Sequence, residues 1–313
     1  MIYSKVFLRM RMPRLSILLP VRDAADYLPE AIASLEAQTL QDWECLAIED
    51  GSTDSSAEIL NSWQKRDTRV RVLEGGAQGI VHALNLGLAE AKAPMIARMD
   101  ADDISLPTRL EEQVDFMSTH PDVVACGTGV SMVDPVGRML CPIHPATDHS
   151  IIVERLIKGG ATAIVHPTLM VRTKCLKKLG GYREIFCHVE DFDLYLRLSD
   201  VGKLANLDGI LLHYRQHAAS ANVTRREQQC VLRLKALNEY RERHGHLPLE
   251  QLAFGRSHLN TLTDLYADWS MKAAAAGNSK VAYLYALLAN AREFWRPKRW
   301  KLFWQVYALS RQS

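Results

Sequence analysis

The chain has 313 residues, of which 48% are hydrophobic and 24% charged, and its formal net charge at pH 7 is +2. This balance excludes an intrinsically disordered chain and a general nucleic-acid-binding protein, because both classes depart strongly from average composition or charge. A chain of this length can bury a large core, so we expect one large domain with an appendage, or two domains.

Cysteine usage and hydropathy bear on the compartment. The cysteines form neither a Cys-x-x-Cys pair nor a compact disulfide scaffold. No apolar run approaches the length that a membrane crossing requires, and the N-terminus lacks the apolar core and cleavage site of a signal peptide. We therefore expect reduced thiols and a cytoplasmic location.

Short apolar runs alternate with helical patterns over the first third of the chain. The runs at residues 15–21, 43–48, 70–73 and 95–99 each predict a buried strand. Apolar residues at helical spacing follow each of the first three runs, namely Leu28, Ile32 and Leu35, then Ile59, Leu60 and Trp63, then Leu84, Leu86 and Leu88. Strands that alternate with helices at this interval predict a parallel sheet with right-handed crossovers.

Polar clusters come directly after three of these strands. They are Pro20-Val21-Arg22-Asp23, Glu49-Asp50-Gly51 and Asp100-Ala101-Asp102-Asp103. Ligands of open α/β sheets bind beyond the carboxyl ends of the strands. We therefore expect these three clusters to converge on one edge of the sheet and to form a binding site.

The rest of the chain changes character. Apolar residues at 123–127 and 129–133 precede a turn at Asp134-Pro135-Val136-Gly137, which predicts a hairpin and an antiparallel extension of the sheet. From about Arg225 helix formers dominate, and Gly277 after Lys272–Ala276 predicts a helix C-cap. We expect a basic tail at 1–11, with Met12 as an alternative start, an α/β domain at 12–225 and a helical region at 226–313.

The carboxylates of Asp100, Asp102 and Asp103 point to a metal. Carboxylates at i and i+2 of an extended segment point the same way, and a turn beyond a strand end lets both reach Mg²⁺ or Mn²⁺. An isolated Asp-x-Asp is more often an acidic turn that caps the next helix, here the one that Pro107 begins. The two neighbouring polar clusters favour the metal site.

A second acidic segment, Glu190-Asp191-Phe192-Asp193, precedes Leu194, Leu196 and Leu198. Taken alone, it is typical of the acidic first turn of a helix. Its position downstream of the predicted metal site favours a functional role instead.

Together these motifs resemble the family 2 glycosyltransferases, inverting enzymes of the GT-A fold that use nucleotide-activated sugars. The resemblance covers residues 14–220 and also includes Leu35-Glu36-Ala37-Gln38-Thr39, His166-Pro167, Gly180-Gly181-Tyr182, and Tyr214-Arg215-Gln216-His217 with Ser220. It implies an α/β fold with a Rossmann-like, mixed, mainly parallel sheet flanked by helices. Residues 12–225 would be the nucleotide-sugar-binding catalytic domain, followed by a C-terminal helical appendage.

The resemblance also implies roles for individual residues. Nucleotide-binding residues would be Pro20, Val21, Arg22, Asp23, Asp50 and Asp100, although the family often has an aromatic residue where Arg22 stands. A divalent cation, Mn²⁺ or Mg²⁺, would be held by Asp102 and His217. Asp191 would be the catalytic base, with further substrate contacts from Glu190, His166, Arg215 and Asp103. Asp103 could instead cap the next helix, and Arg215 could neutralise a phosphate.

The sequence thus predicts an inverting, metal-dependent glycosyltransferase of the hexosyltransferase type. It would move a sugar from a nucleoside diphosphate donor, with UDP favoured, to a hydroxyl of a saccharide or glycolipid in cell-surface polysaccharide synthesis. One alternative is a sugar-phosphate nucleotidyltransferase, which ordinarily carries a Gly-rich basic loop after its first strand. Another is a non-catalytic regulatory protein that binds nucleotide sugars, and such a protein would not need Asp191.

The C-terminal end suggests a further partner. Residues 294–304 mix aromatic and basic side chains, which is typical of segments that lie in a membrane interface. Peripheral contact with the inner face of the membrane is one hypothesis. The alternative is that these aromatic residues pack on the catalytic domain or on a second subunit of a homo-oligomer.

Overall fold

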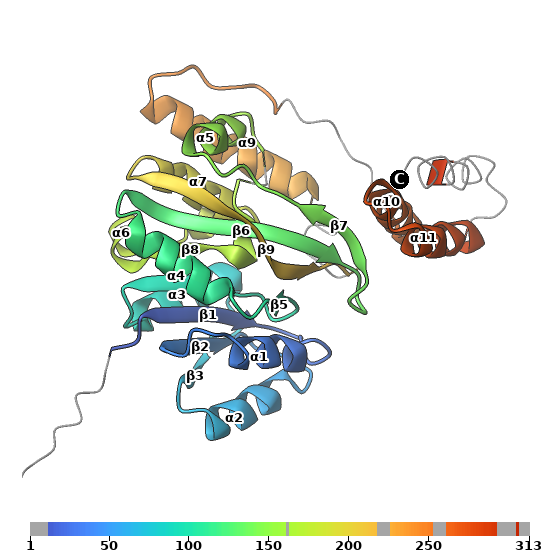
Figure 1. Ribbon diagram of the computed structural model, residues 1–313. Helices are drawn as coiled ribbons and strands as arrows, with labels where there is room; N and C mark the ends of the chain where they lie inside the picture. The colour runs from blue at the N-terminus through green and yellow to red at the C-terminus, as the bar shows by residue number, and fades with distance from the viewer. Residues whose placement is uncertain (1–11, 161–162, 218–225, 253–260, 293–304, 307–313) are drawn as a thin grey trace, which may run out of the picture.

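A computed structural model of the protein describes residues 12–160, 163–217, 226–252, 261–292 and 305–306. The predicted basic tail at 1–11, Ser220 and the aromatic and basic segment at 294–304 lie outside the described residues. The strands form one mixed sheet in the order β3-β2-β1-β4-β8-β6-β9-β5, with β7 paired to β6 (Figure 1). Their bounds are β1 Leu15–Val21, β2 Trp43–Glu49, β3 Val70–Glu74, β4 Met95–Arg98, β5 Ile104–Ser105, β6 Val123–Val133, β7 Met139–Ile143, β8 Met170–Arg172 and β9 Lys203–Arg215.

Helices cover both faces of this sheet. They are α1 Leu28–Glu36, α2 Ser56–Arg66, α3 Ile80–Glu90, α4 Arg109–Thr119, α5 His149–Ile157, α6 Thr173–Lys178, α7 Glu190–Ser199, α9 Arg226–Arg243, α10 Leu262–Ala275 and α11 Ser279–Arg292, with short 3₁₀ turns η1 His166–Thr168 and η2 Glu184–Phe186. Figure 1 shows α1 and α2 at the end of the sheet that β3 closes, and α5, α7 and α9 at the opposite end. The predicted α/β fold class, a mixed sheet flanked by helices, is confirmed.

The first half of the sheet is parallel, as the alternation of strands and helices predicts. Strands β1 and β2 are buried along their whole length, and parallel strands are stable only when both faces are covered. Successive side chains of β1 face opposite sides. Ile17 and Leu19 pack in one apolar cluster with Ile32 of α1, whereas Leu18 packs in another with Leu84 of α3.

The second half of the sheet is mixed. Strand β8 pairs antiparallel with both β4 and β6, and β6 runs parallel to β9. The predicted hairpin is confirmed, because β7 pairs antiparallel with β6 across the turn that contains Gly137, whose φ is 84°. This arrangement brings the C-terminal end of β9 beside the turn that follows β4.

The C-terminal helices pack in two places. Helix α9 contacts α7, and its Ala236 and Leu237 join the apolar cluster that also contains α3 and α7. Helices α10 and α11 pack on each other and on β7, with Trp269 and Tyr285 against Leu140. Within the described ranges, every helix is too short or too polar to cross a bilayer. The domain boundary at residue 225 stays a prediction.

One buried polar contact joins α11 to the hairpin. The carboxylate of Asp134 is fully buried and accepts hydrogen bonds from Arg138 Nε (2.6 Å) and from the Tyr285 hydroxyl (2.8 Å). We expect Tyr285→Phe to lower the free energy of unfolding by about 1–2 kcal/mol, because it removes one donor from a buried charge. Guanidinium denaturation measures this change, and an unaltered midpoint would show that the contact is not formed in solution.

Candidate active site

A cavity of about 250 Å³ lies at the carboxyl ends of β1, β2 and β4. Its lining includes every residue predicted to bind nucleotide and both residues predicted to hold a metal: Pro20, Val21, Arg22, Asp23, Asp50, Asp100, Asp102 and His217. The three polar clusters therefore meet at one edge of the sheet, as expected. The lining also includes Ala24, Tyr27, Ile80, Ala83 and Ala101, to which the sequence analysis gave no role.

Asp50 lines the cavity and is buried. Its two carboxylate oxygens accept hydrogen bonds from the backbone N–H groups of Gln78 and Gly79, each at 2.8 Å. Gly79, with a φ of 94°, is the N-cap of α3, so Asp50 fixes the start of that helix. Each carboxylate oxygen accepts more than one hydrogen bond. Asp50 can therefore hold α3 and still accept a hydrogen bond from a ligand, with the Arg22 guanidinium 3.9 Å away.

Asp23 joins two loops. Its Oδ1 accepts hydrogen bonds from the backbone N–H of Thr53 (2.7 Å) and from the Thr53 hydroxyl (3.0 Å). These bonds lower the pKa of Asp23. Its φ of 48° lies in the left-handed region, which an Asp adopts more readily than most residues. The loop after β1 is thereby held against the loop after β2 at the rim of the cavity.

Three carboxylates crowd together after β4. One oxygen each from Asp100, Asp102 and Asp103 lie within 4.8 Å of one another. Burial and the charges of the other two carboxylates raise the pKa of Asp103 well above its usual value. Asp103 Oδ1 accepts a hydrogen bond from the Arg215 backbone N–H (2.8 Å), and its buried Oδ2 has no partner in the described part of the chain. Like charges held this close favour a divalent cation.

His217 approaches the same group from the end of β9. Its Nε2 lies 2.9 Å from Asp102 Oδ2, and its ring stacks on Tyr27 with centroids 5.4 Å apart. The predicted metal-holding pair is thus brought together, although the two residues are far apart in the sequence. Imidazole nitrogen and carboxylate oxygen are both ligands for Mn²⁺, so the residues present fit a divalent cation.

Asp191 lies in the first turn of α7 and does not line the cavity. Its charge acts on the acidic loop, which is residues 100–103 after β4. Burial raises the pKa of Asp191, while the positive charges of Arg233 and Arg98 lower it. Its Oδ1 accepts a hydrogen bond from the local backbone N–H of Phe192, at 2.7 Å. Burial is the main cause that raises the pKa of Asp100, and the charges of Asp102 and Asp191 raise it further. The two predicted functional carboxylates therefore interact electrostatically.

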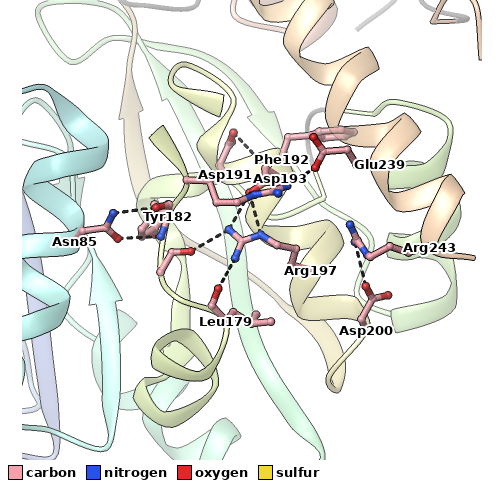
Figure 2. Close-up of polar contacts among 12 residues, drawn as sticks. Asn85, Leu179, Tyr182, Asp191, Phe192, Asp193, Arg197, Asp200, Glu239 and Arg243 are labelled. Atoms are coloured by element: carbon pink, nitrogen blue, oxygen red, sulfur yellow. Dashed lines mark hydrogen bonds and ion pairs between the residues drawn. The ribbon is translucent and has the colours of Figure 1, made fainter. Parts of the chain in front are cut away.

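Ion pairs fix the helix that carries Asp191. Figure 2 shows Asp191 at the start of α7, next to Asp193, which accepts a hydrogen bond from Arg197 Nε at 2.9 Å. Asp193 also pairs with Arg183. Asn85 of α3 bonds both backbone groups of Tyr182, at 2.8 and 2.9 Å. These contacts use Asp193, and not Asp191, to hold the helix in place.

The sequence also matches a known family. A sequence model of Glycosyl transferase family 2 matches residues 16–180, which is more than half of the chain. The chain belongs to this family. It is a glycosyltransferase, and the resemblance drawn from its motifs is confirmed.

Two bacterial glycosyltransferases are similar in sequence to this chain. The O-antigen biosynthesis glycosyltransferase WbnJ of Escherichia coli is 31% identical over 66% of this chain and 81% of its own length. The amylovoran biosynthesis glycosyltransferase AmsE of Erwinia amylovora is 29% identical over 65% of this chain and 76% of its own.

Solved structures share the fold. S. aureus TarS 1-349 in complex with UDP-GlcNAc superposes with a TM-score of 0.59 and 17% identity, covering 96% of this chain and 92% of that one. The mannosyltransferase PcManGT from Pyrobaculum calidifontis, in complex with GDP-Man and Mn²⁺, has a TM-score of 0.53 and 15% identity, over 96% and 81% of the two chains. At these identities the likeness shows the fold alone.

Arg215 of this glycosyltransferase lies beneath the acidic loop and not in the cavity. Its Nε donates to the Asp102 carbonyl (2.8 Å), one Nη to the Pro135 carbonyl (2.7 Å) and the other to Glu30 (2.5 Å). The side chain is 2% exposed. Its nitrogens bind protein atoms and hold the loop in place. Its predicted contact with a phosphate of the substrate stays a prediction.

Glu190 and His166 form a buried pair, and Glu190 directly precedes Asp191 in the chain. Glu190 Oε1 lies 3.9 Å from His166 Nδ1, and His166 Nε2 lies 3.3 Å from the Tyr182 hydroxyl. Burial lowers the pKa of His166 well below its usual value, so its ring is neutral. Burial and the charge of Asp191 raise the pKa of Glu190 to about 7. Neither residue lines the cavity, so their predicted contact with substrate stays a prediction.

The raised pKa of Glu190 has a consequence for stability. As pH rises from the usual value of 4.5 to about 7, the unfolded chain releases this proton before the folded chain does, which destabilises the fold. We expect Glu190→Gln to raise the free energy of unfolding by about 1–3 kcal/mol near pH 8 and to change it little near pH 4. Urea denaturation at both pH values measures this, with exposed Glu154→Gln as the control. An equal effect at both pH values would contradict it.

Two residues near the site, Tyr27 and Arg98, were not predicted from the sequence. Tyr27 lines the cavity between His217 and the guanidinium of Arg215, whose Cζ lies 4.9 Å from the ring centroid. Arg98 is buried at the end of β4. The signal for Arg98 was present, since it is the one charged residue in the apolar run 95–99. A charge in a buried strand requires a partner.

Proposed function

We propose that this protein is an inverting, metal-dependent glycosyltransferase that uses a nucleoside diphosphate sugar as donor. The acceptor we propose is a hydroxyl of a saccharide or glycolipid in cell-surface polysaccharide synthesis. The observation that carries this proposal is the meeting of the cavity, the three carboxylates and His217. Family membership and the named roles of WbnJ and AmsE in O-antigen and amylovoran biosynthesis support it.

We assign the cavity to the donor. The nucleoside would lie between the loop Pro20–Asp23 and Asp50, whose carboxylate can accept a hydrogen bond from the base. Arg22, with a half-exposed guanidinium, could stack on that base. We expect uridine as the base, as the family resemblance implies. TarS binds UDP-GlcNAc and PcManGT binds GDP-Man, so both bases belong in the test.

Asp102, His217 and the neighbouring carboxylates would hold the divalent cation. When bound, such a cation neutralises the charge that develops on a departing diphosphate. The chain's own part is to fix these ligands. Arg215 does so by bonding the Asp102 carbonyl, and its backbone N–H orients Asp103.

Asp191 would act as the base. Its carboxylate accepts the proton of the acceptor hydroxyl while that oxygen attacks the anomeric carbon of the donor sugar. The bond from that carbon to the diphosphate oxygen breaks on the opposite face, so one displacement inverts the configuration. Partial burial raises the pKa of Asp191, which makes it a stronger base than an exposed carboxylate.

Turnover across a donor panel tests this function. The protein is incubated with UDP-, GDP- and dTDP-sugars and Mn²⁺ or Mg²⁺, and the released products are identified. We expect one class of donor to release nucleoside diphosphate only when metal is present. Release of pyrophosphate from a sugar phosphate and a nucleoside triphosphate would instead identify a nucleotidyltransferase. Binding of a donor without any turnover would identify a regulatory protein.

A further inference from the structure

Arg98 is the last residue of β4, and its positively charged side chain is buried. It is 5% exposed, and its two Nη atoms contact the two carboxylate oxygens of Asp100, one of them at 2.5 Å. Its Nε is buried and has no hydrogen-bond partner among the residues that the structure describes. Burying a guanidinium costs free energy unless it is paired, so packing alone does not explain a buried arginine at this position.

The backbone fixes where this charge lies. The N–H of Arg98 donates to the Leu169 carbonyl (2.8 Å), and its carbonyl accepts a hydrogen bond from the buried Arg109 (3.4 Å). Strand β4 is paired on both sides, with β1 and with β8. The guanidinium therefore reaches Asp100 from a rigid strand, and not from a loop.

The same charge acts on the other side of the site. It lowers the pKa of Asp191 and of Glu190 at the start of α7, and it also lowers the pKa of His166 in η1. The hydroxyls of Tyr182 and Tyr195 face the same charge. From α9, Arg233 is the other cation that acts on Asp191. Arg98 thus bonds Asp100 directly, and its charge also acts on the carboxylates of α7.

We propose that Arg98 is a positioning residue shared by the two halves of the active site. Its planar fork orients Asp100 toward the donor cavity, and its positive charge acts on the carboxylates at the start of α7. This inference rests on the proposed function for the roles of Asp100 and Asp191. The two tasks use different properties of the side chain, namely its two-nitrogen geometry and its positive charge.

Two substitutions separate these tasks. Arg98→Lys keeps the charge but cannot form the two-nitrogen fork, whereas Arg98→Met removes both and keeps a similar length. The matched control is Arg71→Met on β3, which breaks a surface ion pair with Glu90 of α3. In each full-length variant, the pH dependence of kcat and the Kd of the donor are measured.

For Arg98→Met, we expect the acid limb of kcat to move up by about one pH unit, because Asp191 loses a stabilising cation. We expect the donor Kd to weaken roughly tenfold in both Arg98 variants, since Asp100 loses its bidentate partner. Arg98→Lys should keep the acid limb of the parent. Arg71→Met should change neither quantity.

Several results would overturn the inference. An Arg98→Met variant with lower kcat but the parental acid limb would show a purely structural role. If that variant does not fold, the Arg98→Lys variant decides. Donor binding as tight as in the parent would show that the two-nitrogen contact with Asp100 is not needed. Failure of the parent to turn over any donor would count against the proposed function alone. In that case carbon-13 NMR of Asp191, assigned with Asp191→Asn, reports the same pKa shift in Arg98→Met without turnover, and an unchanged pKa would refute the inference.

Discussion

Asp191→Asn is expected to lower kcat for transfer by about 10²–10⁴-fold, the range that a general base typically contributes. The amide has nearly the same shape but cannot accept the proton of the acceptor hydroxyl. Asp191 does not line the donor cavity, and its Oδ1 accepts a hydrogen bond from the backbone N–H of Phe192. The donor should therefore bind with a Kd within about twofold of the parent value, since no donor contact is lost.

Two measurements on this variant separate chemistry from binding. Initial rates with saturating donor give kcat, and isothermal titration calorimetry gives the donor Kd. Exposed Asp122→Asn, which breaks a surface pair with Lys203, is the matched control and should leave both unchanged. If Asp191→Asn keeps the parental kcat, another group takes the proton, and the assignment of the base fails.

Asp102→Ala is expected to abolish metal-dependent donor binding. Asp102 is the carboxylate that lies 2.9 Å from His217 and lines the cavity. Its removal takes one proposed metal ligand from the group and removes the carboxylate that contacts the His217 imidazole. We expect the affinity for Mn²⁺ in the presence of nucleoside diphosphate to fall by about 10²-fold or more, and turnover to fall with it.

Electron paramagnetic resonance of free Mn²⁺ measures this affinity directly. Asp115→Ala, a change of an exposed carboxylate in α4, controls for the loss of one negative charge from the protein. Retention of parental Mn²⁺ affinity by Asp102→Ala would place the cation elsewhere. Loss of affinity in the Asp115 control would mean that net charge, and not coordination, determines binding.

The elements of the first half of the fold follow from sequence because local patterns decide them. The apolar run Leu15–Val21 has the bounds of β1, and the helical spacing of Leu28, Ile32 and Leu35 falls within α1. Parallel connectivity then places Asp50 and Asp102 at one edge. The lining of the cavity was therefore predictable from strand ends alone.

Contacts between distant segments were not predictable in this way. Nothing local in β8 shows that it pairs antiparallel with β4, although this pairing sets the position of η1 and His166. The role of Arg215 depends on Glu30 and on the Pro135 carbonyl, which approach it only in the folded chain. Sequence pattern identifies which side chains reach an edge, whereas tertiary packing decides which of them remain available to a ligand.

The anomeric configuration of the released sugar tests the central claim most directly. The donor that the panel identifies is incubated with Mn²⁺, with water in place of the acceptor, and proton NMR records the first anomer formed before mutarotation. We predict the anomer opposite to that of the donor, formed by the parent with Mn²⁺ and absent without it. Retention of configuration, or equal release without metal, would contradict a single displacement at a site built from Asp102 and Asp191.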